Sequence, residues 1–405
     1  MSSKPTPKDV LQATVNAVHA AESKAAAANN LGIPITTLKS RLIDAEAKGL
    51  KPTVKSAEDP RILKNTIKNL EKDLKQAVLE TDERAAVKAV IGSLRKGVED
   101  LRLPTWAAEP VGGKSVSGVP TLFLSDLHWG ERVNPAEINH ANEYNLKIAH
   151  ARMGYTLETA IHLLRIVDPE MRYPGIVMPL GGDMISGNIH EELTATNELN
   201  TMPTVLDLYG VLVAAIERAA SVFGSVFLPC VSGNHGRDTR KVWAKQRNHT
   251  SFDWLLYRFL AKHFEADRRI TFFIPDGSDA HYRVFNTRYL LTHGDQFRGG
   301  DSIIGPLGPL TRGNQKKQAR NQAIDMEYDV LLAGHWHTYI HLERLIVNGS
   351  MKGMDEYSYA GNFGFEPPRQ ALWLTHPRYG ITYRMPVLCD KPPKPKALEW
   401  VSLRK

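Results

Sequence analysis

Two histidines separated by one residue follow an apolar run in the segment LLAGHWHTYI. The run Leu331–Ala333 is typical of the end of a buried strand; it stops at Gly334, and His335 and His337 come next. Because alternating residues of an extended segment point to opposite sides, such a pair could serve two neighbouring metal ions. The alternative is a polar loop that contains two histidines by chance, and the rest of the chain has to decide between them.

Four further apolar segments end in side chains of the same chemical kind. They supply Asp126 and His128 after TLFLS, Asp183 after GIVMPLGG, Asn234 and His235 after SVFLPCVSG, and His293 after RYLLT. Carboxylate, imidazole and amide oxygen are donors that suit borderline divalent metals. Sites in open α/β sheets lie beyond the carboxyl ends of the strands. The sequence therefore predicts a metal site at the sheet edge where these five segments end.

The elements that must position these residues alternate in type. From Thr121 onward, short apolar strands alternate with longer helical stretches, which indicates α/β layering and a domain over 121–388. The segment 104–120 is rich in Pro, Gly and Ser and is therefore expected to be a flexible linker. The basic, Pro-rich tail 389–405 is expected to hang loose or dock late.

Bulk composition excludes several classes of protein. The chain has 405 residues, 42% of them hydrophobic and 23% charged, as in soluble globular proteins of two or three domains. No apolar run of 18 residues and no secretory signal are present, so we expect no membrane span. With 2 cysteines, a disulfide framework is not expected, which favours the cytoplasm. The net charge of +7 weakly favours a polyanionic partner.

The order of the motifs over residues 121–350 resembles that of the calcineurin-like metallophosphoesterases. The series D-x-H, G-D, G-N-H, H and G-H-x-H is complete and in sequence. This family includes nucleases that process double-strand breaks, and the resemblance implies a two-sheet sandwich flanked by helices. It also implies two divalent metal ions, for which we expect Mn²⁺, with Fe²⁺, Zn²⁺ and Mg²⁺ as alternatives.

The resemblance also assigns the ligands and a mechanism. One ion would be held by Asp126, His128 and His337, the other by Asn234, His293 and His335, with Asp183 bridging both. Two ions about 3.5–4 Å apart polarise a phosphoryl oxygen and lower the pKa of a shared water. The bridging hydroxide formed in this way attacks phosphorus in line.

His235 is expected, as in the family, to protonate or stabilise the leaving group; the alternative is a structural role beside the ligands. The family usually has an acidic residue after G-N-H, where it can orient the histidine. Here that residue is Gly236, so another group must hold His235, and Asp238 is one candidate.

Further residues near these motifs are candidates for substrate contacts. Asn188 and His190 could reach the substrate or merely cap a helix. Arg237 and Arg240 could bind phosphate bidentately, or could be an exposed loop pair. The Gly- and Pro-rich insertion 297–322 carries several basic residues and is expected to be an irregular functional loop, with a solvated surface as the alternative.

The segment 1–52 resembles a DNA-binding helix-turn-helix. Ala27 and Ala28 allow close helix approach, Gly32 permits the turn, and Leu38 and Leu42 would bury the second helix. An Ala-rich helix pair without DNA contact is the alternative. The side chains expected to face DNA are Thr36, Thr37, Lys39, Ser40 and Arg41.

Residues 53–103 carry two apolar seams with spacings of three and four. They indicate a helical hairpin or a broken coiled coil, and either could make the chain a homodimer. The seams are formed by Leu63, Ile67, Leu70 and Leu74, and by Val87, Ile91, Leu94, Val98 and Leu101.

Taken together, these features predict a metal-dependent phosphodiesterase that cleaves DNA. The helix-turn-helix and the positive charge favour a polynucleotide over the first alternative, a phosphatase or small-nucleotide phosphodiesterase. The complete ligand set argues against the second alternative, a DNA-binding regulator with an inactive phosphoesterase domain. Chains of this kind tend to be carried by phages, so a role in the cytoplasm of a bacterial host is expected.

Overall fold

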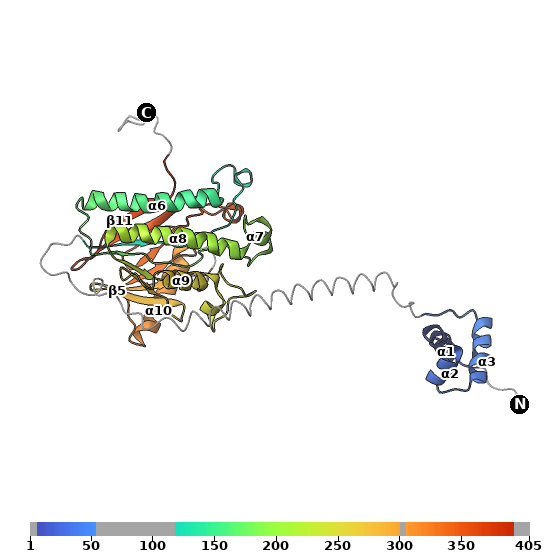
Figure 1. Cartoon of the computed structure of the whole chain (residues 1–405). Helices are drawn as coiled ribbons and strands as arrows, with labels where there is room; N and C mark the ends of the chain where they lie inside the picture. The colour runs from blue at the N-terminus through green and yellow to red at the C-terminus, as the bar shows by residue number, and fades with distance from the viewer. Residues whose placement is uncertain (1–5, 54–117, 300–304, 393–405) are drawn as a thin grey trace, which may run out of the picture. The chain divides into compact units, whose positions relative to one another are not determined.

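The structure is a computed structural model that describes residues 6–53, 118–299 and 305–392 (Figure 1). Nearly all of the predicted 53–103 hairpin and 104–120 linker, and most of the 389–405 tail, lie outside the described residues. The chain divides into two compact units, 1–89 and 90–405.

Within its described residues, 6–53, the N-terminal unit forms the helices α1 (Lys8–Ala20), α2 (Lys24–Asn30) and α3 (Ile35–Ala47). Gly32 has a φ of +64°, in the left-handed region that glycine adopts most easily, and it turns the chain between α2 and α3. Ala27, Ala28 and Leu38 form the buried core of this unit, with Leu42 packed against it. The predicted all-α N-terminal segment is thereby confirmed.

The described residues of the C-terminal unit form two sheets. The first has the order β11 (Gly380–Leu388), β10 (Arg369–His376), β1 (Val119–Phe123), β2 (Ile176–Val177), β3 (Val226–Pro229), β4 (Ile270–Phe273). The second has the order β5 (Asp279–Val284), β6 (Thr287–Thr292), β7 (Val330–Ala333), β9 (Leu345–Val347), β8 (Ile340–His341). Strands β1 to β4 are mutually parallel, as are β6, β7 and β9.

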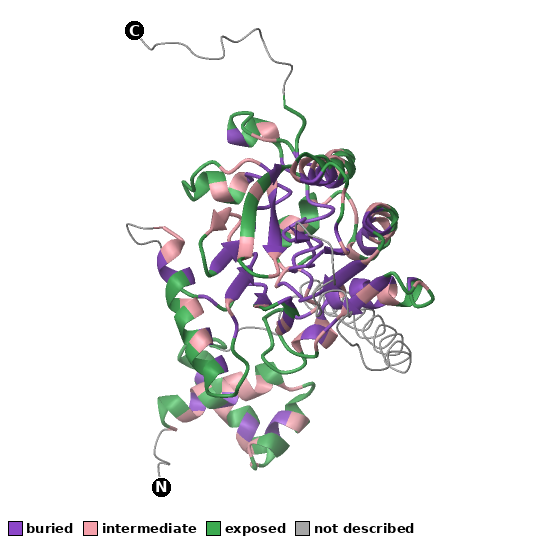
Figure 2. Ribbon diagram, turned by 90° about the vertical axis from the view of Figure 1, so that its left-hand side faces the viewer, coloured by how far each residue is buried: buried purple, intermediate pink, exposed green. Residues whose placement is uncertain are grey.

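The two sheets pack face to face. One buried cluster joins side chains of the first sheet, among them Phe123 and Trp373, to side chains of the second, among them Tyr289 and Leu291. Successive strand residues face opposite sides, so Leu290 points away into a separate cluster. Figure 2 shows these buried strands at the centre of the unit. The expected α/β two-sheet sandwich is confirmed.

Helices cover both outer faces of the sandwich. The helices α6 (Leu146–Val167) and α8 (Thr201–Phe223) contact each other and the first sheet, and α9 (Phe252–His263) packs on α8 (Figure 1). On the outer face of the second sheet, Leu310 of α10 (Leu307–Gln322) packs in the same buried cluster as Leu290. The shorter helical elements are η1 (Pro135–Ile138), α7 (Glu191–Thr196), η2 (Arg247–Thr250) and α11 (Glu356–Ala360).

The expectation of an irregular loop over 297–322 is wrong for most of its length, because 307–322 form α10. Gly308 and Pro309 stand in the first helical turn, where proline is tolerated. Two of its basic residues are used internally, since Lys317 and Arg320 each lie 2.6 Å from a carboxylate oxygen of Asp279.

Within residues 6–53, 118–299 and 305–392, no helix combines the length and the apolar character needed to cross a membrane.

Candidate metal centre

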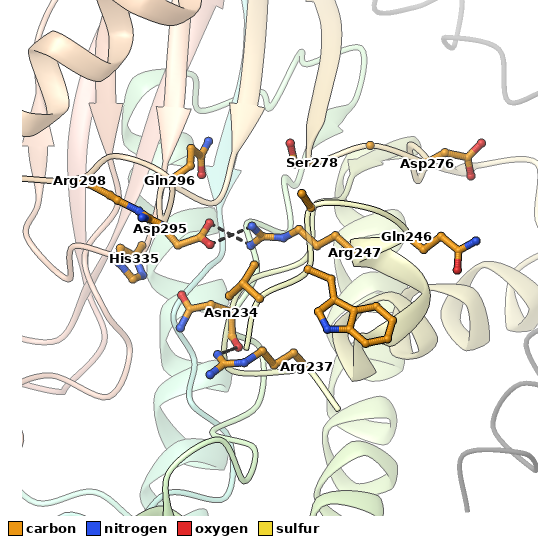
Figure 3. A pocket seen from close by; sticks show the side chains of 14 residues that line it. Asn234, Arg237, Gln246, Arg247, Asp276, Ser278, Asp295, Gln296, Arg298 and His335 are labelled. Atoms are coloured by element: carbon orange, nitrogen blue, oxygen red, sulfur yellow. Dashed lines mark hydrogen bonds and ion pairs between the residues drawn. The ribbon is translucent and has the colours of Figure 1, made fainter. Parts of the chain in front are cut away.

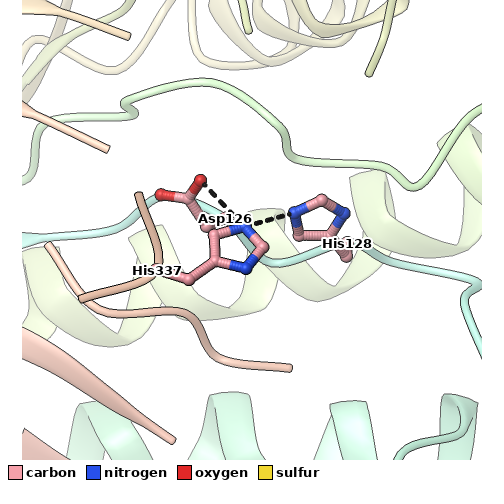
Figure 4. A group of neighbouring side chains, drawn as sticks. All are labelled: Asp126, His128 and His337. Carbon is pink, nitrogen blue, oxygen red and sulfur yellow. Dashed lines mark hydrogen bonds and ion pairs between the residues drawn. The ribbon is translucent and has the colours of Figure 1, made fainter. Parts of the chain in front are cut away.

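The first group of donors lies where β1 and β7 end. Asp126 and His128 follow β1, and His337 follows β7 (Figure 4). The Nε2 atoms of His128 and His337 are 2.9 Å apart, and Asp126 Oδ1 lies 3.5 Å from His337 Nε2. The donor atoms of all three residues fall within 4.8 Å of one another.

The second group lies beside the first. His293 Nε2 is 3.0 Å from Asp183 Oδ2 and 3.1 Å from Asn234 Oδ1. Donor atoms of Asp183, His293 and His335 lie within 4.8 Å of one another, and those of Asp183, His128 and His235 meet the same limit. Asp183 is therefore the carboxylate that faces both groups, as the bridging assignment requires.

Both sheets contribute to the site. Asp126, Asp183 and Asn234 follow the parallel strands β1, β2 and β3 of the first sheet, whereas His293 and His335 follow β6 and β7 of the second. The carboxyl ends of these strands meet at one edge of the sandwich. Residues far apart in sequence come together for this reason.

The backbone at five of these positions has an uncommon conformation. Positive φ values occur at Asp126 (53°), His128 (47°), Asp183 (50°), His335 (68°) and His337 (51°). Non-glycine residues seldom adopt this region, and such residues cluster at functional sites. The extended backbone expected for the pair His335 and His337 is therefore wrong, although the two side chains do join different groups.

Backbone carbonyls fix two of the imidazole rings. His293 Nδ1 donates to the carbonyl of Gly181 at 2.8 Å, and His235 Nδ1 donates to that of Ser186 at 2.9 Å. In each ring the other nitrogen, Nε2, is then the one that is available to the site. The group that orients His235 is thus a backbone carbonyl, in the role for which Asp238 was a candidate.

Asp253, on α9, joins two of the loops that carry donors. Its carboxylate accepts hydrogen bonds from the backbone N–H groups of Asp183 (3.0 Å), Met184 (3.2 Å) and Gly233 (2.9 Å). A Cβ atom on Gly236 would lie 2.8 Å from Asp253 Oδ1. Asp253 therefore occupies the space next to the position where the resembled family carries its acidic residue.

A buried network of charged side chains contacts the Nδ1 side of His128, opposite the nitrogen that faces the site. Glu131 Oε2 lies 3.3 Å from His128 Nδ1 and accepts a hydrogen bond from Ser186 Oγ at 3.0 Å. Lys352 Nζ donates to Glu131 Oε1 at 2.8 Å and also pairs with Asp355. A carboxylate behind a ligating imidazole orients the ring and makes it more basic. Sequence reasoning missed Glu131 and Lys352, although Glu131 lies three residues after His128.

Charges inside the site shift its pKa values. Burial disfavours an ionised Asp183, but the His293 and His235 rings outweigh burial and hold the pKa of Asp183 well below its usual value. Burial also opposes a charged His293, yet Asp183 raises the pKa of His293 to about 10. Burial lowers the pKa values of His128 and His335 to about 4. Neutral imidazoles are the form that binds metal, so His128 and His335 are ready to act as donors.

The donor set fits divalent metal ions. Carboxylate, imidazole and amide oxygen converge from two sheets. The Nε2 atoms of His128 and His337 face each other at 2.9 Å, so a cation could bind both lone pairs. His128 faces Glu131 with its far nitrogen, and His293 faces the Gly181 carbonyl, as metal-ligating histidines commonly do.

The four predicted substrate-binding residues differ in their surroundings. Arg237 donates from Nη1 to the carbonyl of Asn234 at 2.6 Å and from Nε to that of Thr239 at 3.0 Å, so it holds the donor loop. His190 lies at the start of α7 with its ring centroid 6.2 Å from that of His235. Asn188 and Arg240 are exposed. Bidentate phosphate binding by Arg237 and Arg240 stays a prediction.

On α3, the predicted DNA-facing residues lie on the surface of the N-terminal unit. Thr36, Lys39 and Ser40 are exposed, and Thr37 and Arg41 are partly exposed. Their role in binding DNA stays a prediction.

No family model matches the chain, and no curated protein matches it in sequence. Among solved structures, a predicted phosphoesterase from Streptococcus pneumoniae is 11% identical, with 64% of this chain and 84% of that chain covered and a TM-score of 0.26. Wild-type Vps29 complexed with Zn²⁺, from Entamoeba histolytica, is 10% identical over 66% of this chain and 99% of that chain, with a TM-score of 0.26. The sulfate thiohydrolase SoxB from Thermus thermophilus is 11% identical over 70% of this chain and 59% of that chain, with a TM-score of 0.31. TM-scores this low carry no argument about the reaction of this chain.

Proposed function

We propose that this chain is a dinuclear metal-dependent phosphoesterase that hydrolyses phosphodiester bonds in DNA. The observation that supports this most strongly is the position of Asp183 between two groups of donors built from five strand ends. In this proposal Asp126, His128 and His337 hold one ion, Asp183 faces both, and the remaining donors hold the other, namely Asn234, His293 and His335.

The residues of the site have separate tasks in this reaction. The two ions, when bound, polarise the phosphoryl oxygen and lower the pKa of a water molecule. Asp183 offsets part of the repulsion between the two cations. His235 keeps Nδ1–H on the Ser186 carbonyl, so its Nε2 is the atom that carries the proton for the leaving oxygen. Burial lowers the pKa of His235, so its protonated ring is a stronger acid but a smaller fraction of the molecules at neutral pH.

DNA is favoured as substrate by the charge and by the N-terminal unit. The chain carries a net charge of +7, and α3 presents Thr36, Lys39 and Ser40 on its surface. We propose that α3 contacts DNA, that Mn²⁺ is the working metal, and that the segment 53–103 makes the chain a homodimer. We also propose that the protein is encoded by a phage and acts in the cytoplasm of the bacterial host.

The experiment is incubation of the full chain with linear DNA, circular DNA and bis(4-nitrophenyl) phosphate, each with and without Mn²⁺. We expect metal-dependent hydrolysis of all three, and Fe²⁺, Zn²⁺ and Mg²⁺ are tested in parallel. Cleavage of the nitrophenyl diester alone would favour a small-nucleotide phosphodiesterase. No hydrolysis with any of the four metals would refute the phosphodiesterase and leave the phosphatase or the DNA-binding regulator.

Asp183→Asn supplies the internal test, because it keeps the side-chain volume but removes the charge that faces both ions. We expect at most one metal ion per chain and a small fraction of normal turnover. Asp325→Asn is the matched control, since Asp325 is an exposed aspartate with a similar backbone (φ of 55°). Two tightly bound ions and a normal rate in Asp183→Asn would mean that Asp183 is not the bridge.

A further inference from the structure

A cavity opens directly beside the metal centre. It has a volume of about 560 Å³ and includes Asn234 and His335 of the second donor group (Figure 3). Its other walls come from three loops, which contribute residues within 242–247, 276–278 and 295–298. The volume lies within the range of about 300–1,000 Å³ typical of small-molecule sites. A substrate whose phosphate lies at the metal centre would therefore place a neighbouring group in this cavity.

One wall of the cavity exposes a large aromatic side chain. Trp243 is 52% exposed and Val242 is 45% exposed, in the loop between the G-N-H motif and α9. An indole ring left in contact with water forgoes the burial that other tryptophans of this unit achieve, among them Trp129 and Trp254. A flat apolar surface at the rim of a site suits a planar ligand.

The walls around Trp243 are held in place by partly buried contacts. Arg247 pairs with both carboxylate oxygens of Asp295 at 2.8 and 2.9 Å, which joins the loop of Trp243 to the loop after His293. Asn248 donates to the carbonyls of Pro275 and Gly277 at 2.8 and 2.9 Å and so fixes the third loop. A cavity that is formed before the ligand arrives loses less free energy when the ligand binds.

Other polar groups of the cavity are available to a ligand. Within the part of the chain that the structure describes, the side chains of Arg298, Gln246 and Asp276 have no hydrogen bond or ion pair. Arg298 is exposed and offers a guanidinium to a phosphate; Gln246 and Asp276 offer a donor and acceptors to a polar edge. Arg247, in contrast, is neutralised by Asp295.

We infer that this cavity binds an unpaired nucleobase stacked on Trp243, and that the substrate is single-stranded nucleic acid. The inference rests on the proposed function, because the metal centre must take the adjoining phosphodiester. A base has the flat face that stacks on Trp243 and the polar edge that Gln246 and Asp276 can contact. A base within a duplex is stacked and paired already, so it cannot enter the cavity without leaving the helix.

The kinetic test compares two substrates with the same leaving group. Thymidine 4-nitrophenyl phosphate, as the 5′ and the 3′ ester, carries a base, whereas methyl 4-nitrophenyl phosphate does not. Stacking of a base on an aromatic ring is worth about 1–3 kcal/mol, a factor of roughly 5 to 150 in rate. In Trp243→Ala, we expect the ratio of kcat/KM between a thymidine ester and the methyl ester to fall by that factor. Trp243→Phe should retain most of the ratio.

A binding test gives a readout that does not depend on turnover. Fluorescence anisotropy with labelled oligothymidylate, and with an abasic oligomer of equal length, is measured on the full chain in EDTA. We expect Trp243→Ala to weaken binding of oligothymidylate by a similar factor and to leave the abasic oligomer bound as before. Tyr379→Ala is the matched control, because Tyr379 is 73% exposed on the turn between β10 and β11, away from the cavity.

The outcomes separate this inference from the proposed function. If neither ester is hydrolysed by the unaltered protein with any metal, the proposed function fails, and the binding test still decides about the base. If Trp243→Ala changes neither the ester ratio nor the preference for oligothymidylate, the stacking site is refuted. Faster cleavage within blunt duplex DNA than within single strands would also overturn the inference.

Discussion

Replacing Asp253 by Asn tests how the loops carrying Asp183 and Asn234 are held together. In the structure, Asp253 Oδ2 accepts from the backbone N–H groups of Asp183 and Gly233, and Oδ1 accepts from that of Met184. An asparagine has one acceptor oxygen. If this oxygen takes the place of Oδ2, the amide NH₂ group faces the N–H of Met184, and two donors then oppose each other in a buried site.

The cost of the substitution can be worked out from these contacts. A buried donor left without an acceptor costs about 1–3 kcal/mol, and the two hydrogen bonds that remain go to a neutral oxygen and are weaker. We therefore expect Asp253→Asn to lower the free energy of unfolding by at least ~1 kcal/mol. Because residues behind metal ligands position them, metal affinity should fall by about 10- to 100-fold.

The assay combines denaturant unfolding, metal titration and hydrolysis of bis(4-nitrophenyl) phosphate. Asp267→Asn is the control, since Asp267 pairs with Arg269 on the surface and touches none of the donor loops. A variant Asp253→Asn with unchanged metal affinity and unchanged kcat would refute the reasoning, whatever its effect on unfolding.

A second substitution sharpens the test. Gly236→Asp alone should be destabilising, because its Cβ would lie 2.8 Å from Asp253 Oδ1. Combined with Asp253→Ala, it removes the clash with the side chain, leaves a Cβ contact of 3.1 Å with the backbone nitrogen of residue 253, and returns a carboxylate to the same region. We expect the double variant to bind metal more tightly than Asp253→Ala alone; equal or weaker binding would mean that the two positions do not share a role.

Three further predictions concern the reaction and its substrate. His235→Ala should retain its metal content but lose most turnover, as metal analysis and kinetics would show; near-normal activity would sink its assignment. Removal of residues 1–103 should spare hydrolysis of a small phosphodiester and weaken DNA binding at fixed salt; equally tight binding would contradict a DNA-binding N-terminal unit. In the metal-free protein the pKa of His293 is about 10 against a usual value of 6.5, so its proton stabilises the fold below pH 6.5 and that contribution is lost as pH rises to about 10. Metal must displace this proton, so calorimetry in two buffers should show proton release at about pH 7–8 and tighter binding at higher pH; binding without proton release would contradict this.

The sequence predicts those features of the molecule whose residues are neighbours along the chain. Each apolar strand and the polar residues after it are contiguous, so the α/β sandwich and the set of donors could be inferred from the sequence. The strand β2, only 2 residues long, is still recognisable from the GIVMPLGG run that leads to Asp183.

The partners of the donors could not be inferred in this way. Asp253 lies 70 residues from Asp183, and Lys352 lies 221 residues from Glu131, so only the topology of the two sheets and α9 brings them together. The positive φ values at His335 and His337 could not be inferred either, since an H-x-H pattern is compatible with both extended and left-handed backbone. Gly308 and Pro309 suggested a loop, because the sequence does not show that they lie in the first turn of a helix.

The supply of donors by both sheets has a consequence beyond catalysis. An ion held by Asp126 from one sheet and His337 from the other would act as a crosslink between the two halves of the sandwich, and Asp183 with His293 would do the same at the second position. A ligand that binds only the folded chain adds about 2.7 kcal/mol of stability when present at roughly 100 times its dissociation constant. A chelator would then behave as a mild denaturant for this protein. Its melting temperature would have meaning only at a stated concentration of free metal.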